Sequence, residues 1–185
     1  MMVNTNFLQL IANFIAFLCL LMHGHVLCNG GLNSQFIASE AEALLEFFSI
    51  ILPSLEAVRL SGCQLHKLPA TLPPKLNFDS LVTLDLSVNY FNSIPDWLFE
   101  NCHHLQNLNL SKNNLQGQIT YSIERLKTLE TLDLSRNRLV GSIPDFIDRL
   151  VSLATLDLSY NMLIGSIPLK LGQDHGQNSL KELSF

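Results

Sequence analysis

The residues whose types suit catalysis are three histidines and a spaced set of aspartates: His66, His103, His104, Asp85, Asp133 and Asp157. His103 and His104 are adjacent, so on a turn their side chains diverge and do not readily hold one metal ion. Asp133 and Asp157 could form a carboxylate pair. Their spacing, however, predicts an open strand surface, without the pocket that raises the pKa of a general acid. We expect no catalysis, no metal site and no cofactor.

A second set of residues suits binding: Lys112, Arg136 and Tyr160, each 24 residues after the last, with Asp133 and Asp157 beside them. Their cationic and aromatic side chains could receive a carboxylate or an aromatic group of a ligand. The alternative is a solvated face on which Lys112 and Arg136 pair with nearby Asp and Glu. The net charge of -5 gives no reason to expect nucleic acid as a partner.

These residues belong to a repeat, which must be recognised before local structure is assigned. Four copies start 24 residues apart at Leu81, Leu105, Leu129 and Leu153, with the sequences LVTLDLSVNYF, LQNLNLSKNNL, LETLDLSRNRL and LATLDLSYNML. A looser copy, LEAVRLSGCQL, starts at Leu55, and a broken one, LKELSF, starts at Leu180. The repeat predicts a stack of similar coils, each covering the next.

The pattern LxxLxL within each copy predicts a short strand, because residues two apart in a strand share one face. The leucines then point into the core. The residues between them form an exposed column on a parallel sheet: Arg59, Asp85, Asn109, Asp133 and Asp157. Five such strands, at about 4.8 Å spacing and with five exposed residues each, project roughly 340 Å². A standard protein partner buries about 800 Å² per side, so we expect a small peptide or part of a longer surface.

Three residues after the second strand leucine, each copy places a residue that we expect to be buried: Cys63, Asn89, Asn113, Asn137 and Asn161. At this point the chain turns inward and leaves backbone groups without partners, which a buried amide can bind. We interpret these residues as a structural ladder, in which Cys63 is a small buried group. Ligand or glycan contact is the alternative reading of the asparagines.

The return path of each coil carries glycines where a positive φ or close packing is expected, followed by isoleucines that cover the core: Gly117, Gly141 and Gly165, then Ile119, Ile143 and Ile167. The copy at Leu81 differs. We expect its Trp97, Leu98 and Phe99 to close a wider coil, with Cys102 in the place of the core leucines Leu126 and Leu150.

Residues 1–28 precede the repeats and include an apolar run from Phe7 to Met22. This run is shorter than the about 20 residues of a membrane span, so it predicts a signal peptide cleaved near Cys28. No Lys or Arg precedes the run, and an uncleaved anchor and a buried core segment are the alternatives. With Cys63 and Cys102 both facing the core, we expect no disulfide framework.

The copies resemble the plant-type leucine-rich repeat, LxxLxxLxLxxNxLxGxIPxxLxx, from Leu55 to Pro168 and weakly from Leu180 to Phe185. The resemblance implies an α/β repeat solenoid: a right-handed superhelix with a concave parallel sheet, a short second strand near GxIP and a short N-terminal helix. Residues 29–54, with ASEAEALLEFF, resemble half of the family's N-terminal cap. Residues 55–185 form the array, of about four and a half to five repeats with the last truncated. The missing cap halves imply a fragment, with Leu180, Leu183 and Phe185 exposed.

The resemblance also implies the function. The chain is similar to ectodomains of plant receptor-like proteins. It would act by protein binding as a cell-surface recognition module for a peptide, wall-derived or protein ligand, with a co-receptor kinase as a partner, in plant defence or development. It would be extracellular or bound to the plasma membrane. The alternatives are a secreted inhibitor of wall-degrading enzymes and a truncated product without function of its own. One sequon, Asn109 with Ser111, marks a candidate site for a glycoprotein.

Overall fold

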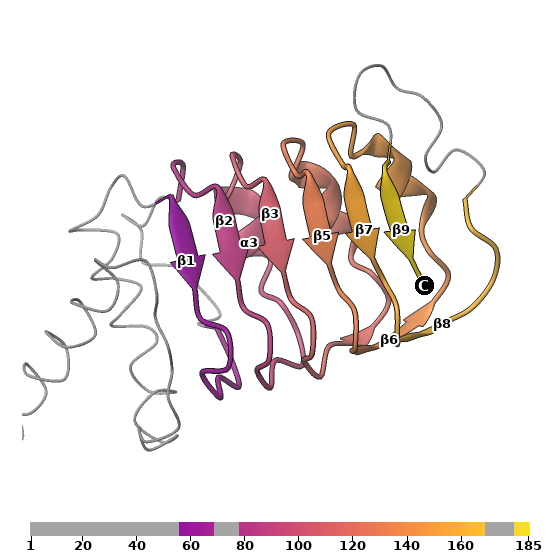
Figure 1. The fold of residues 1–185 in the computed structure, drawn as a ribbon, viewed down its shortest axis with the longest axis horizontal. Helices are drawn as coiled ribbons and strands as arrows, with labels where there is room; N and C mark the ends of the chain where they lie inside the picture. Colours follow the sequence, from indigo (N-terminus) through magenta and orange to yellow (C-terminus); the bar gives the residue numbers. More distant parts are fainter. Residues whose placement is uncertain (1–55, 69–77, 169–179) are drawn as a thin grey trace, which may run out of the picture.

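The computed structural model describes residues 56–68, 78–168 and 180–185. The described chain winds into a stack of coils, each contributing one strand to the same sheet (Figure 1). The predicted signal peptide, the half cap with its helix and their boundaries lie outside these residues. Within the described part, no helix is long and apolar enough to cross a membrane.

The large sheet has six parallel strands in the order β1-β2-β3-β5-β7-β9. Its strands are three residues long: β1 (Ala57–Arg59), β2 (Thr83–Asp85), β3 (Asn107–Asn109), β5 (Thr131–Asp133), β7 (Thr155–Asp157) and β9 (Glu182–Ser184). Equivalent residues of successive copies pair directly, as Leu84 does with Leu108. The repeat length therefore fixes the register, and every strand buries its central apolar residue or, in β9, half-buries it.

The sheet is one strand larger than the sequence predicts. The segment LKELSF, read as a broken copy, forms β9 and pairs with β7 through Leu156 and Leu183. Leu180 and Leu183 are consequently half-buried against the core, and only Phe185, 52% exposed, remains open as expected.

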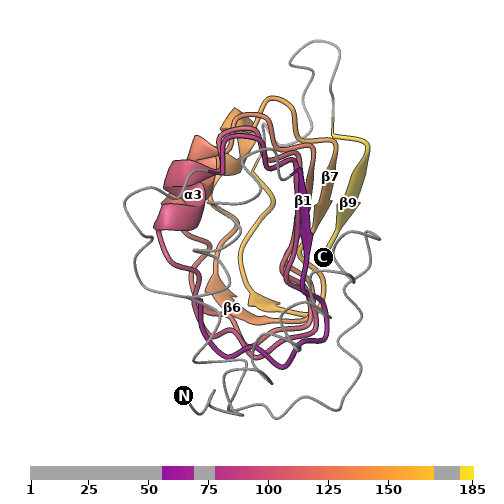
Figure 2. The same ribbon diagram turned by 90° about the vertical axis from the view of Figure 1, so that its left-hand side faces the viewer.

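A second, three-stranded sheet lines the return path of the later coils. It consists of β4 (Gln116–Gly117), β6 (Arg138–Gly141) and β8 (Met162–Leu163), again parallel. Seen along the stack, the large sheet forms one wall and β6 lies near the opposite lower corner (Figure 2). The short second strand near GxIP is thus present. The glycines that close it, Gly117, Gly141 and Gly165, have φ between 81° and 88°, a conformation that L side chains rarely adopt.

In three of the coils, a short described helix lies on the side away from the large sheet (Figures 1 and 2). They are α3 (Trp97–Asn101) and the 3-10 helices η1 (Tyr121–Arg125) and η2 (Asp145–Arg149). As expected, Trp97, Leu98 and Phe99 of the divergent copy are buried, and they face the core from α3.

The core is one continuous cluster between these walls, built from the strand leucines and the apolar residues of the helices. Ile119 and Ile143 are buried in this cluster, as expected. Ile167, expected to cover the core in the same way, is 47% exposed. Of the coil that follows, the described residues are 180–185, which form β9.

Candidate ligand-binding face

The outward column of the large sheet begins with an exposed Arg59 and continues through four half-buried residues, Asp85, Asn109, Asp133 and Asp157. In each of these four, Oδ1 accepts a hydrogen bond of 2.9–3.0 Å from the backbone N–H two residues later. The side chains therefore close the turn that ends the strand. Asp133 and Asp157, predicted to contact ligand, each have one oxygen committed to the fold and only the other left for a partner.

Asn109 is the neutral member of this column and the candidate glycosylation site. Its Oδ1 accepts hydrogen bonds from the Ser111 N–H, at 3.0 Å, and from the Ser111 hydroxyl, at 2.8 Å. The turn thus uses the amide oxygen, whereas a glycan would be attached to the amide nitrogen. A glycan at this position would project from the middle of the sheet.

The next outward column lies at the carboxyl ends of the strands and consists of Val88, Lys112, Arg136 and Tyr160. All four have a left-handed backbone, with φ between 54° and 56°. The backbone N–H groups of Val88, Lys112 and Arg136 still continue the ladder, each donating to a serine carbonyl of the next coil at 2.8–3.0 Å. In the first copy, Gly62 takes this place with φ 70° and donates to the Ser87 carbonyl.

The structure brings Lys112, Arg136 and Tyr160 together in this column, on successive coils. The Arg136 guanidinium lies over the Tyr160 ring, 4.2 Å from the ring centroid, and Tyr160 is 69% exposed. Neither Lys112 nor Arg136 forms an ion pair with any described residue. Pairing of these two cations with nearby carboxylates is therefore absent among the described residues, and the choice between a ligand contact and a solvated face rests on other evidence.

A parallel outward row, two residues further on, was not singled out from the sequence. It contains Tyr90, Asn114, Arg138 and Met162. Tyr90 stacks on His66 with ring centroids 4.8 Å apart, and Arg138 is an exposed cation without an ion pair among the described residues. The sequence could have predicted this row from the position of the ladder asparagine. Because the asparagine points inward, the residues on either side of it in each copy are expected to point outward.

That buried asparagine lies between the two rows and serves the fold. In each coil its Nδ2 donates to two carbonyls of its own turn and to one of the preceding coil, as Asn137 does to Leu134, Ser135 and Leu110 at 3.0–3.2 Å. Its Oδ1 accepts from a backbone N–H of the preceding coil, which for Asn137 is that of Leu115 at 3.0 Å. Asn89, Asn113 and Asn161 make the equivalent bonds. These side chains are fully occupied in the backbone ladder.

Cys63 takes the ladder position in the first copy and is buried. It is disulfide-bonded, and its partner lies outside the described residues. We expected no disulfide framework, and the bond at Cys63 departs from that expectation, because a core-facing position was taken to exclude pairing. Cys102, by contrast, is a free, fully buried thiol. Burial, and then the charge of Asp79, raises the pKa of Cys102 to about 12.

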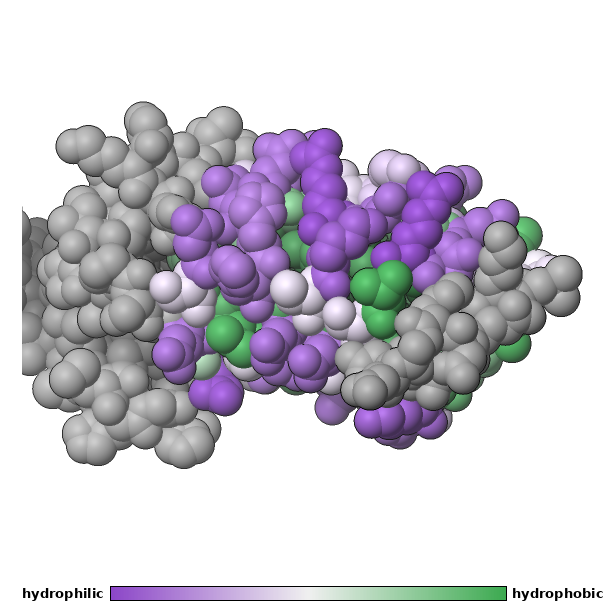
Figure 3. All heavy atoms as spheres, turned by 90° about the horizontal axis from the view of Figure 1, so that it is seen from above, coloured by the Kyte–Doolittle hydropathy of each residue, from purple (hydrophilic) through white to green (hydrophobic). Residues whose placement is uncertain are grey.

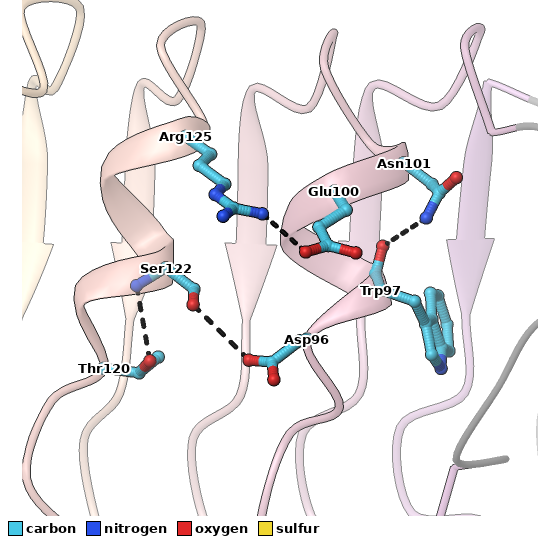
Figure 4. A network of polar contacts seen from close by, with 7 residues as sticks. All are labelled: Asp96, Trp97, Glu100, Asn101, Thr120, Ser122 and Arg125. Carbon is cyan, nitrogen blue, oxygen red and sulfur yellow. Dashed lines mark hydrogen bonds and ion pairs between the residues drawn. The ribbon is translucent and has the colours of Figure 1, made fainter.

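Ion pairs gather on the helical side of the coils. Arg125 of η1 binds Glu100 of α3 at 2.6 Å, and the Ser122 hydroxyl donates to Asp96 at 3.4 Å (Figure 4). Glu124 binds Arg149 of the next coil at 3.2 Å and Lys127 at 3.5 Å. Its pKa is lowered, chiefly by a hydrogen bond from Tyr121 and then by Arg149. Seen from above Figure 1, the surface is mainly hydrophilic (Figure 3).

The histidines do not come together. His103 and His104 are exposed on the turn after α3, and the described residues contain no group of His, Cys, Asp or Glu that could hold a metal ion. The two rows beside the ladder asparagines do place exposed cationic and aromatic side chains on successive coils, without an ion pair among the described residues.

Comparisons with known proteins agree with this architecture. A family model described as leucine rich repeat matches residues 79–139 and 120–163. A chain of the BIR3–SERK2 complex from Arabidopsis thaliana is 37% identical, with 68% of this chain and 68% of that chain covered and a TM-score of 0.56. The SOBIR1 receptor kinase ectodomain from the same plant is 33% identical, with coverages of 60% and 58% and a TM-score of 0.51.

A third match is the Arabidopsis receptor kinase HAESA in complex with the peptide hormone IDA and the co-receptor SERK1. It is 31% identical, with a TM-score of 0.51, and the match covers 66% of this chain but only 25% of that chain. Among curated protein sequences, no match is found.

Proposed function

Because the chain belongs to the leucine-rich-repeat proteins of the plant receptor type, we propose that it is a non-catalytic recognition module of the plant cell surface. Its ligand would be a peptide, a wall-derived molecule or a protein, bound in defence or developmental signalling. The receptors to which it is similar include one in complex with a peptide hormone and a co-receptor. The match covers 25% of that receptor's chain. A co-receptor kinase is therefore named here only as a proposed partner.

The single observation that carries the proposal is the row of Lys112, Arg136 and Tyr160. These side chains are exposed, lie on adjacent coils, and make no ion pair within the described part of the chain. The rest of the coil is committed to the fold: the leucines fill the core, the asparagines bind the backbone, and the aspartates close turns. We propose that Asp133 and Asp157 contribute their second oxygens at the edge of the site.

A random-peptide display selection on the purified chain tests the proposal. Wild-type protein should retain a defined set of peptides, and the variant Lys112→Ala, Arg136→Ala, Tyr160→Ala should lose at least ten-fold of that capture while being secreted normally. The matched control is Arg125→Ala, Lys127→Ala, Tyr121→Ala on the helical side. Like the test variant, it removes one arginine, one lysine and one tyrosine. Equal capture by the two variants contradicts this placement of the site.

A further inference from the structure

The surface formed by the two outward rows has an order along the stack that points to the chemistry of its ligand. We name it the turn rim and define it as Val88, Tyr90, Lys112, Asn114, Arg136, Arg138, Tyr160 and Met162. Its first and last coils carry apolar or aromatic side chains, which are 46–69% exposed. Its two middle coils carry the cations Lys112, Arg136 and Arg138.

The cations of the turn rim are free for a partner. Lys112, Arg136 and Arg138 have no ion pair with a described residue, whereas Arg125, Lys127 and Arg149 on the helical side are all paired. Arg136 is also held by its stacking on Tyr160, so less side-chain freedom is lost when it binds. Three unpaired cations within two neighbouring coils create a local positive potential in a chain whose net charge is -5.

The aspartates of the adjacent strand column disfavour binding of an anion anywhere but on the turn rim. The strand column beside it carries Asp85, Asp133 and Asp157, each with one oxygen not used by its turn. A negatively charged ligand is repelled from that column and attracted by the cations at the strand ends. The rim and the strand face therefore select opposite charges.

The spacing of the rim matches an extended peptide. Coils are about 4.8 Å apart, so the three steps from the Val88 coil to the Tyr160 coil span about 14 Å. In an extended peptide, side chains on one face repeat every two residues, and positions 1, 3 and 5 span about 13 Å. Apolar side chains at positions 1 and 5 would meet the two ends of the rim. A carboxylate at position 3 would then lie between Lys112 and Arg136.

We propose that the turn rim binds a short extended peptide segment with a central acidic side chain flanked by apolar ones. This deepens the proposed function by naming the class of ligand, and it rests on that proposal. The apolar ends of the rim favour a peptide over a uniformly charged polysaccharide, which offers them nothing to contact. A guanidinium fork suits a carboxylate because it can donate two parallel hydrogen bonds.

The test uses the full chain and a labelled pentapeptide with blocked ends and the sequence Leu-Ser-Glu-Ser-Phe, followed by fluorescence anisotropy at low ionic strength. The comparison peptide has Gln in place of Glu, which keeps the shape and removes the charge. Wild-type protein should bind the Glu peptide at least ten-fold more tightly than the Gln peptide. The variant Lys112→Gln, Arg136→Gln, Arg138→Gln should lose this preference.

The matched control, Arg125→Gln, Lys127→Gln, Arg149→Gln, also removes three positive charges and should keep the preference within two-fold. A preference lost equally in both variants would show that only net charge matters and would overturn the proposal. So would a wild-type chain without any preference, or one that binds polygalacturonate but neither peptide. If display selection yields rim-dependent ligands without acidic residues, the proposed function stands and this inference fails. Unchanged circular dichroism and melting temperature establish that the variants are folded.

Discussion

Arg136 lies over the ring of Tyr160, 4.2 Å from its centroid, although the two residues are on different coils. The guanidinium thus links the turns that follow β5 and β7. A cation over an aromatic face at an exposed position stabilises by about 0.5–1 kcal/mol. Two residues that we assign to ligand binding therefore also stabilise the packing of adjacent coils.

A double-mutant cycle measures that link. We expect Arg136→Ala and Tyr160→Ala to show a coupling of about 0.5–1 kcal/mol in the free energy of unfolding. Tyr160→Phe should retain most of it, because the ring face is kept. The cycle between Arg138 and Tyr160 serves as the control, since no ring contact joins them. A coupling near zero for the first pair would contradict a formed stack in solution.

Val88 offers a direct test of the left-handed turns. Its φ is 55°, and a β-branched side chain is strained there, whereas asparagine tolerates this conformation. We expect Val88→Asn to raise the free energy of unfolding by about 0.5–1 kcal/mol. Val140→Asn, at an exposed site in β6 with ordinary backbone, is the control and should give no gain. Chemical denaturation of both variants measures these changes. A lower free energy of unfolding for Val88→Asn would contradict a left-handed backbone at position 88.

Much of this fold could be predicted because a constant repeat length places equivalent residues side by side on adjacent strands. Leucines two apart fixed which side of each strand faces inward, and equal spacing set the register of Leu84, Leu108, Leu132 and Leu156. The sixth strand was missed because LKELSF was read as a broken copy, although a strand of three residues needs no more sequence than it has.

The left-handed turns were missed for a different reason. Valine, lysine, arginine and tyrosine have no special preference for positive φ, so nothing in Val88 or Lys112 signals it. The one clue is Gly62, which occupies the same position in the first copy. Arg138 was overlooked because it lies beyond β5, at the first residue of β6, where the period-two pattern of LxxLxL no longer applies. The disulfide of Cys63 depends on a contact far away in sequence, which spacing alone does not reveal.

Asn137 should matter far more for stability than its small size suggests. It is 8% exposed and makes four hydrogen bonds, two of them to the preceding coil. Asn137→Ala leaves several buried backbone groups without partners, so we expect a loss of about 2–4 kcal/mol. Glu130→Ala, on the exposed strand face, should change the stability by less than about 0.5 kcal/mol. Equal melting temperatures for the two variants would refute the structural role of the ladder.

Cys102 should be inert in the native chain. Its pKa is raised from 9.0 to about 12 by burial and then by Asp79, so the native thiol keeps its proton when the unfolded one has lost it. Stability contributed by this group is therefore present below pH 9.0 and falls as the pH rises from there toward 12.

Alkylation with iodoacetamide at pH about 8.5, near the pKa of a free thiol, followed by peptide mapping, measures this directly. We expect modification of Cys102 to be at least a hundred-fold slower in the native chain than in urea. Comparable rates in both states would mean that the thiol is accessible, contrary to its burial.

The central claim is that ligands are bound at the turn rim, and hydroxyl-radical footprinting tests it most directly. Tyrosine and methionine side chains are readily oxidised, and the rim carries Tyr90, Tyr160 and Met162, all about half exposed or more. Tyr121 on η1 is 61% exposed and provides an internal control on the helical side. With a peptide recovered by display selection bound, we predict reduced oxidation at Tyr90, Tyr160 and Met162 and unchanged oxidation at Tyr121. Protection of Tyr121 with an unprotected rim would contradict the account.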